Sequence, residues 1–202
     1  MITSEAIHRA LSLHVPVTGS FAPDRDHAAV ALALAGGDRG LSLCFIRRVE
    51  KATDPWSGHM AFPGGRADPG DTSARAVAER EAREEVALDL SNARLLGALS
   101  DLPVRLGGVD TSMVLSSFVY DVGQSPPTLA PNREEVAEAY WVPLDHLWDQ
   151  RNAAQLNLAR NSESLIFPAI RFEGRLIWGL SLRVLNLFSD VLGRPLPHFE
   201  QT

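Results

Sequence analysis

The sequence predicts an α+β fold, in which β-strands and α-helices share one globular domain over residues 1–202. The first observation is composition: 45% of the 202 residues are hydrophobic and 22% are charged, which suits a domain with a sizeable core. The second is pattern, because short β-rich apolar runs and helix-spaced stripes are separated by turns that contain proline and glycine. Helices at residues 3–13 and 180–192 are expected as terminal elaborations of this domain.

The first part of the chain predicts a helix followed by a β-hairpin. Residues 3–13 place Ile7 and Leu11 on one side of an amphipathic helix. An early acid and a central His-Arg pair make this stretch unlike a secretory signal peptide. Apolar runs at residues 27–35 and 41–47 flank a glycine-rich turn and predict a hairpin of buried strands.

The second half predicts further strands and a core-facing helix. We expect strands at residues 93–100, 112–122 and 139–144, the last followed by a short helix, a loop at 101–109, and a hairpin from runs 165–170 and 175–178. The C-terminal helix carries apolar residues at helical spacing, which predicts a buried stripe of Leu180, Val184, Leu187 and Val191.

Charge and composition narrow the classes of partner. The formal net charge is −6, which argues against a dedicated nucleic-acid binder with a basic face. No apolar run approaches the roughly 18 to 20 residues of a membrane span. The single cysteine, Cys44, lies in an apolar run and predicts a buried structural thiol, which fits a reducing cytoplasm.

Most of the chemistry is expected between Gly64 and Leu88, where a glycine turn leads into an acidic helix. If the helix begins near Ser73, Glu81 and Glu85 continue its apolar face, and Glu84 lies one residue step around the helix from Glu85. Carboxylates near a helix C-terminus repel one another and face the negative end of the helix dipole.

A bound divalent cation would favour this crowding of acids. Carboxylate oxygens, together with a main-chain carbonyl near Gly64, are hard ligands that suit Mg²⁺ or Mn²⁺. The alternative is an exposed, charged helix in which Arg80 pairs with Glu84. Continuation of the apolar face by the acids, and the glycine turn just before the helix, favour the metal site.

The stretch from Gly65 to Leu88 resembles the box of the Nudix hydrolases. The family pattern is Gly, five residues, Glu, seven residues, then Arg-Glu-apolar-x-Glu-Glu-x-Gly-apolar. Here Asp71 follows Gly65 after five residues, and residues 80–88 read REAREEVAL. The chain departs in three ways: Asp71 stands for Glu, one residue is inserted after it, and Ala87 stands for the late Gly.

The resemblance implies the Nudix fold, an α/β/α sandwich with a mixed β-sheet between helices. It also implies an Mg²⁺-dependent hydrolase, with Mn²⁺ as the alternative ion, that cleaves a nucleoside diphosphate linked to another group. Glu81, Glu84 and Glu85, with the carbonyl near Gly64, would hold the ion. The backbone at Gly65 would approach a substrate phosphate closely.

A further acid is implied before the strand at residues 139–144. Related enzymes place such an acid near the metal or the attacking water, and Glu135 matches by sequence context, with Glu134 as an alternative. A loop acid that pairs with Arg133 is the simpler interpretation. In the implied mechanism a water attacks phosphorus in line, Glu81 or Glu135 accepts its proton, and Arg80 orients a glutamate.

Three arginines are candidates for binding substrate phosphates. Arg47 and Arg48 end the strand at residues 41–47, and Arg105 lies in the loop expected at residues 101–109. A guanidinium matches phosphate oxygens bidentately. The alternatives are a solvated strand end for the first two residues and simple exposure for Arg105.

Within the family, the coenzyme A pyrophosphatase branch is the most similar. Gly58 stands four residues before a Phe-Pro-Gly-Gly turn, as in that branch, and the inserted residue after Asp71 and the segment around Trp178 are also similar to it. Asp54 stands where the branch has an arginine. His59 is a candidate proton carrier or substrate contact, and Trp56 a candidate for stacking on a base, although structural roles are expected for both.

The predicted substrate is coenzyme A or a related thioester, cleaved to phosphopantetheine and adenosine 3′,5′-bisphosphate. The alternative substrate is ADP-ribose or another nucleotide sugar. A nucleotide sensor without turnover is the rival from another class, and a structural protein with a degenerate box is a third. We expect a small-molecule nucleotide as partner, no nucleic acid and no membrane; the sequence leaves monomer and homodimer open.

Overall fold

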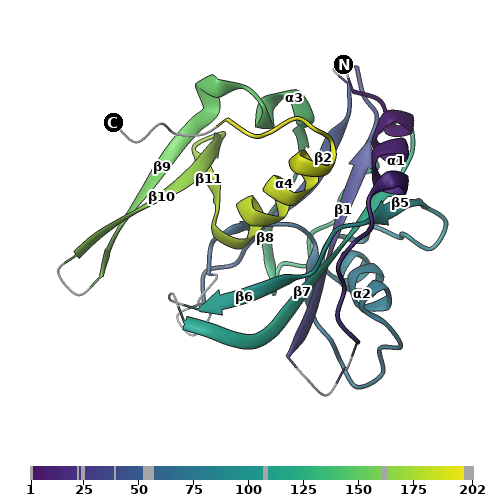
Figure 1. Ribbon diagram of the computed structural model, residues 1–202, viewed down its shortest axis with the longest axis horizontal. Coiled ribbons are helices and arrows are strands. Elements are labelled where there is room, and N and C mark those ends of the chain that lie inside the picture. Colours follow the sequence, from purple (N-terminus) through teal and green to yellow (C-terminus); the bar gives the residue numbers. More distant parts are fainter. Residues whose placement is uncertain are drawn as a thin grey trace.

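The computed structural model describes residues 2–21, 23, 26–38, 40–51, 57–106, 109–160 and 163–197. An eight-stranded sheet runs in the order β3-β2-β1-β7-β5, and β4, β6 and β8 pair with β1, β7 and β2 respectively. In Figure 1, β1 and β7 pass between α4 and α2. The strands of this sheet are β1 (His27–Ala35), β2 (Ser42–Arg48), β3 (Met60–Ala61), β4 (Gly64–Arg66), β5 (Arg94–Ala98), β6 (Leu102–Leu106), β7 (Val109–Asp121) and β8 (Val136–Pro143).

Strand β1 lies at the centre of this sheet. It pairs antiparallel with β2, as the predicted hairpin requires, and parallel with β7, so the sheet is mixed. Alternation along the strand separates two core clusters: Ala29, Ala31 and Ala33 face one side, and Leu32 and Leu34 face the other. The small alanine side chains leave room for a helix to pack closely on their face.

Helix α2 (Ala74–Val86) packs on that alanine face. Its N-cap is Ser73, whose Oγ accepts a hydrogen bond from the Ala76 N–H at 3.1 Å. Val77 and Val86 are among its fully buried residues. The helix ends at Ala87, which adopts a left-handed conformation with φ 56°. The family's late glycine, replaced here by Ala87, therefore corresponds to a position where glycine is conformationally favoured.

The opposite face of the sheet is covered by α1 (Ser4–Leu13) and α4 (Gly179–Val191). Ile7 and Leu11 of α1 are buried, as predicted. The most buried side of α4 is centred on Leu185 and Phe188, so the predicted stripe is only partly right: Val184 is buried, but Leu180, Leu187 and Val191 lie half-buried beside it. Because α4 contacts β3, β10 and β11, several elements determine which side of the helix is buried.

A second, three-stranded sheet in the order β11-β10-β9 follows α3 (Leu144–Leu147) and a short 3₁₀ turn (Gln150–Asn152). Its strands are β9 (Ala153–Arg160), β10 (Glu163–Phe172) and β11 (Arg175–Trp178). The β10–β11 hairpin was predicted from the sequence and is confirmed. Strand β9 was not predicted. Figure 1 shows β9 and β10 projecting from the rest of the molecule.

The loop predicted at residues 101–109 is wrong, because residues 102–106 form β6. Pro103 pairs with Val114 of β7, and the register shifts between Pro103 and Arg105. β6 pairs only with β7 among the described strands, and an edge strand tolerates a proline. Among the helices that the structure describes, none is long and apolar enough to cross a membrane.

Candidate active site

A cleft of about 330 Å³ lies where the C-terminal half of α2 meets β4 and the end of β2. Acidic and basic side chains dominate its lining. It is lined by Arg48, Val49, Lys51, Gly64, Gly65, Asp68, Arg80, Glu81, Glu84, Glu85 and Glu135. All four predicted catalytic glutamates therefore border one cleft.

Glu85 is the most enclosed acid of the cleft, with a relative exposure of 1%. Its Oε2 accepts a hydrogen bond from the Gly64 N–H at 2.8 Å, and Arg48 Nη1 lies 3.9 Å from its Oε1. Burial, with the charges of Glu81 and Glu135, raises the pKa of Glu85 to about 8, and the Gly64 N–H and Arg48 only partly oppose this shift. A nearby cation would stabilise the ionised form of this buried carboxyl group.

Three of the glutamates converge. Carboxylate oxygens of Glu81, Glu85 and Glu135 all lie within 4.8 Å of one another. Burial is the main reason that the pKa of Glu81 is raised, with the charges of Glu84 and Glu135 adding to the shift. Glu81 and Glu85 lie together because both continue the apolar face of α2, as predicted. Glu135 lies on a loop that is distant from them in the sequence.

Glu135 is positioned by the end of α2. The Asn132 N–H donates to the Glu85 carbonyl at 2.8 Å, and the Ala130 N–H donates to the Val86 carbonyl at 3.0 Å. These are carbonyls of the last helical turn, which lack partners within the helix. The loop that satisfies them leads directly to Glu135. Arg133 donates to the Ala137 carbonyl, and the Glu134 N–H donates to Asn132 Oδ1 at 3.2 Å.

Glu84 borders the cleft but points toward Arg80 instead of joining the three-carboxylate cluster. Its side chain is 51% exposed, and its Oε2 accepts from Arg80 Nη1 at 3.0 Å. Arg80 also donates to Glu81 Oε1 at 2.9 Å, to Asp71 Oδ2 at 2.9 Å and to the Arg66 carbonyl at 3.1 Å. The hydrogen bonds from Arg80 lower the pKa of Asp71. Arg80 thus links the loop before α2 to two glutamates.

The glycine turn is shaped by the residues around it. A Cβ added to Gly65 would lie 2.3 Å from Glu81 Oε1, and one added to Gly64 would lie 2.3 Å from the Ala29 carbonyl oxygen. Any side chain at residue 65 would therefore displace a carboxylate of the cluster, and a side chain at residue 64 would clash with β1.

The donor set fits a divalent cation. Three carboxylates converge, one of them buried, and hard oxygen ligands of this kind prefer Mg²⁺ or Mn²⁺. The Arg48 guanidinium lies 3.9 Å from Glu85 Oε1, at the outer limit of an ion pair. Arg80 pairs with Glu81 Oε1 at 2.9 Å, so only two cations face the three carboxylates among these contacts. These contacts favour a cation at the centre of the cluster.

The predicted phosphate-binding arginines do not share one location. Arg48 borders the cleft, but Arg47 binds Glu138 Oε2 through Nε at 2.8 Å and lines neither this cleft nor the neighbouring cavity. Arg105 is exposed on β6, where strand alternation directs it away from the buried Val104. Sequence reasoning missed Lys51, although it is the next cation after Arg48 in the sequence RRVEK.

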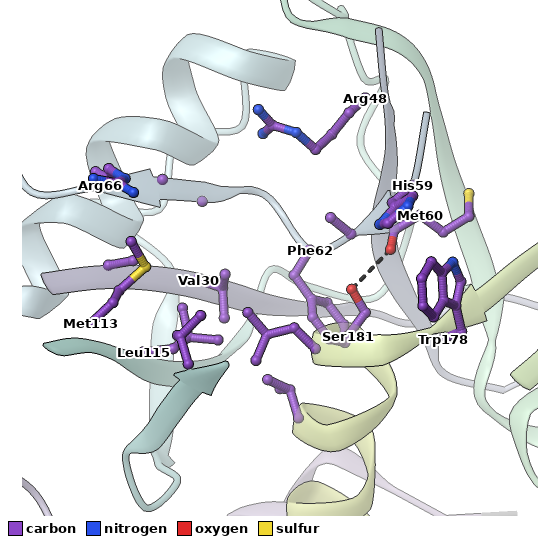
Figure 2. Close-up of a pocket in the computed structure, with 17 residues that line it drawn as sticks. Val30, Arg48, His59, Met60, Phe62, Arg66, Met113, Leu115, Trp178 and Ser181 are labelled. Atoms are coloured by element: carbon purple, nitrogen blue, oxygen red, sulfur yellow. Dashed lines mark hydrogen bonds between the residues drawn. The ribbon is translucent and has the colours of Figure 1, made fainter. Parts of the chain in front are cut away.

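An apolar cavity of about 260 Å³ adjoins the cleft (Figure 2). The two spaces share Arg48, Gly64 and Gly65 as lining residues. Strands of the main sheet, the segment before the glycine turn and the start of α4 form its walls. The remaining lining residues are Ala28, Val30, His59, Met60, Ala61, Phe62, Arg66, Val104, Met113, Leu115, Trp178, Leu180, Ser181 and Val184.

Segments distant in sequence meet at one end of this cavity. The rings of His59 and Trp178 have centroids 4.6 Å apart, and Ser181 Oγ donates to the Met60 carbonyl at 2.8 Å. Gly58, with φ 71°, immediately precedes this contact. The segment before the box and the segment near the C-terminus both resemble the coenzyme A branch. The fold therefore places these two segments next to each other. Asp54 and Trp56 lie outside the described residues.

Comparison with known proteins agrees with the geometry. Residues 25–162 match the NUDIX domain family. An uncharacterized Nudix hydrolase, NudL, from Yersinia enterocolitica is 33% identical over 185 residues, covering 91% of this chain and 89% of the relative. The human mitochondrial coenzyme A diphosphatase NUDT8 is 30% identical over 166 residues, covering 82% and 69% respectively. A MutT/nudix family crystal structure from Enterococcus faecalis superposes with a TM-score of 0.55 at 17% identity, covering 96% of this chain and 70% of that one.

The chain belongs to the NUDIX domain family. It is an enzyme of the Nudix hydrolase class, and the predicted sandwich with a mixed sheet is confirmed.

Proposed function

We propose that this enzyme hydrolyses the pyrophosphate bond of coenzyme A or a derivative, giving phosphopantetheine and adenosine 3′,5′-bisphosphate. The observation that carries the proposal is the contact between His59 and Trp178 on the wall of a cavity that adjoins the acidic cleft. Similarity to the human coenzyme A diphosphatase over 82% of the chain supports the same substrate.

Glu81, Glu85 and Glu135 would hold the Mg²⁺ ion, with Glu84 and the main chain at Gly64 as further ligands. When bound, the ion supplies neutralisation of phosphoryl charge and activation of water. Mn²⁺ is the alternative ion, because it accepts the same oxygen ligands.

The chain's own residues divide the remaining tasks. Glu135 is the exposed member of the carboxylate cluster and Glu81 is half-buried, and one of them accepts the proton of the attacking water. Arg80 holds Glu81 in place through its hydrogen bond of 2.9 Å. Arg48 and Lys51 line the same cleft and provide positive charge for the diphosphate.

A substrate panel tests this proposal. The protein is incubated with Mg²⁺ or Mn²⁺ and coenzyme A, dephospho-coenzyme A, ADP-ribose or other nucleotide sugars, and the products are identified by mass spectrometry. We expect phosphopantetheine and adenosine 3′,5′-bisphosphate from coenzyme A. Consumption of ADP-ribose without release of phosphopantetheine would establish the alternative substrate. Nucleotide binding without hydrolysis of any compound would support a sensor.

A further inference from the structure

We propose that the apolar cavity holds the pantetheine arm of the substrate, and that the 3′-phosphoadenosine half stays outside it, on the side of the charged cleft. This assignment rests on the proposed function and specifies which half of the substrate the cavity selects. It makes the residues around Trp178 and α4 determinants of specificity, separate from the carboxylates that carry out the chemistry.

Charge decides between the two halves of the substrate. The adenosine half carries a phosphate dianion on its ribose, whereas the pantetheine arm is uncharged and consists of methylene, dimethyl, hydroxyl and amide groups with a terminal thiol. Burying a dianion against apolar walls without paired cations is strongly unfavourable. The walls of this cavity include Val30, Val104, Met113, Leu115 and Val184, which offer no hydrogen-bonding side chain.

The arginines that border the cavity do not turn it into a phosphate site. Arg66 Nη1 lies 3.3 Å from Asp26 Oδ1, so its charge is already engaged by an acid. Arg48 borders both spaces and lies 3.9 Å from Glu85 Oε1, on the side of the cleft. Lys51 lines the charged cleft but not the cavity. The positive charge is therefore concentrated where the cavity adjoins the cleft and within the cleft itself.

The shape of the cavity also suits an arm that extends from a diphosphate. Gly64 and Gly65 form the boundary between cleft and cavity, and neither has a side chain to block passage from one to the other. Figure 2 shows His59 and Trp178 at the opposite end of the cavity from Arg66 and Met113. An arm leaving the diphosphate at the glycines would run along the aliphatic walls toward the aromatic pair.

Separate binding of the two product halves tests this assignment. Leu180 lines the cavity, so Leu180→Trp fills part of it; Val30→Phe fills it from the sheet side. Leu187→Trp is the matched control, because it places the same side chain on α4 at a half-buried position that does not line the cavity. Thermal unfolding shows that each variant is folded before binding is measured by calorimetry with phosphopantetheine and, separately, adenosine 3′,5′-bisphosphate.

We expect both cavity-filling variants to weaken phosphopantetheine binding, and to raise KM for coenzyme A, by roughly tenfold or more, because pocket contacts of this size discriminate ligands to that extent. Binding of the bisphosphate should stay within about twofold of the wild type. Weaker bisphosphate binding with unchanged phosphopantetheine binding would overturn the assignment, and so would no change for either ligand. Failure of the wild type to cleave coenzyme A while it cleaves ADP-ribose would instead overturn the proposed function.

Discussion

The acidic cleft and the apolar cavity adjoin one another but are assembled in different ways. Most of the cleft comes from residues 64–85, where one turn and one helix supply the glycines, Arg80 and three glutamates. The cavity draws its lining from residues 28 to 184 and from both sides of the glycine turn. Most residues of the acidic cleft are therefore close together in the sequence, whereas the apolar cavity depends on how distant elements pack.

The largest effect is expected for Glu85→Gln, which removes the buried carboxyl group of the cluster. Turnover should fall by roughly 10³-fold or more, because electrostatic stabilisation at the reacting group is lost. The protein should remain folded, since the amide oxygen can still accept the Gly64 N–H. Steady-state kinetics with Mg²⁺ measure the loss. Glu79→Gln is the control, because Glu79 pairs with Arg75 on the same helix and does not line the cleft; equal losses in both variants would contradict this interpretation.

Gly65→Ala should disturb the cleft without filling the cavity. Its Cβ would meet Glu81 Oε1 at 2.3 Å, so the carboxylate must move. A displacement of about 1 Å lowers kcat roughly 10²-fold. Gly70→Ala is the matched control, since no atom lies within 4 Å of a Cβ at that position. Unchanged kcat in Gly65→Ala would show that Glu81 need not occupy its observed position.

The stability of the metal-free protein should depend on pH through Glu85. Its folded pKa of about 8 lies above the ordinary value of 4.5, so the folded state holds this proton more tightly than the unfolded state. The associated stability is fully present below about pH 4.5 and is lost as pH rises to about 8, a change of a few kcal/mol. Urea unfolding across this range, with chelator, measures the change. Glu85→Gln should flatten this dependence, and Mg²⁺ should restore stability at high pH.

Glu138→Gln should affect the cavity side more than the cleft. Glu138 Oε2 accepts from Arg47 Nε and Arg175 Nη2, each at 2.8 Å, and thereby ties β11, which ends at Trp178, to β2. These side chains are partly exposed, so the two ion pairs should contribute about 1 kcal/mol or less to holding β11 in place. If all of that energy is lost from substrate binding, KM rises by up to about fivefold. kcat should stay unchanged. Glu173→Gln, at the exposed turn of the same hairpin, serves as control; a fall in kcat with unchanged KM would refute the separation.

Ala87→Gly should change stability alone, without an effect on catalysis. Ala87 has φ 56°, and relieving this left-handed strain should stabilise the fold by about 1 kcal/mol. Urea unfolding should show the gain, with no change in kcat or KM. Ala76→Gly within α2 should have the opposite sign, because glycine weakens a helix. Destabilisation by Ala87→Gly would mean that the alanine methyl group makes a contact that outweighs the strain.

Sequence patterns predicted the elements that are governed by local rules. The start of α2 near Ser73 and the position of Glu85 on the apolar face of the helix follow from helical period. Strand β6 was missed because Pro103 indicates a loop, although an edge strand accommodates it through pairing with β7. The buried side of α4 was misplaced because three neighbouring elements, and not the period alone, determine which residues are covered.

By itself, the sequence determined the family resemblance, the acidic helix and the buried thiol at Cys44, and it predicted a divalent-cation site on that helix. These properties depend on residues close together along the chain. Only the tertiary structure showed that Glu135 joins Glu81 and Glu85 while Glu84 turns to Arg80, and that Arg47 lies away from the cleft. It also brought His59 against Trp178 beside the glycine turn. The physical reason is that side-chain convergence across long loops depends on packing and strand register, which local periodicity does not encode.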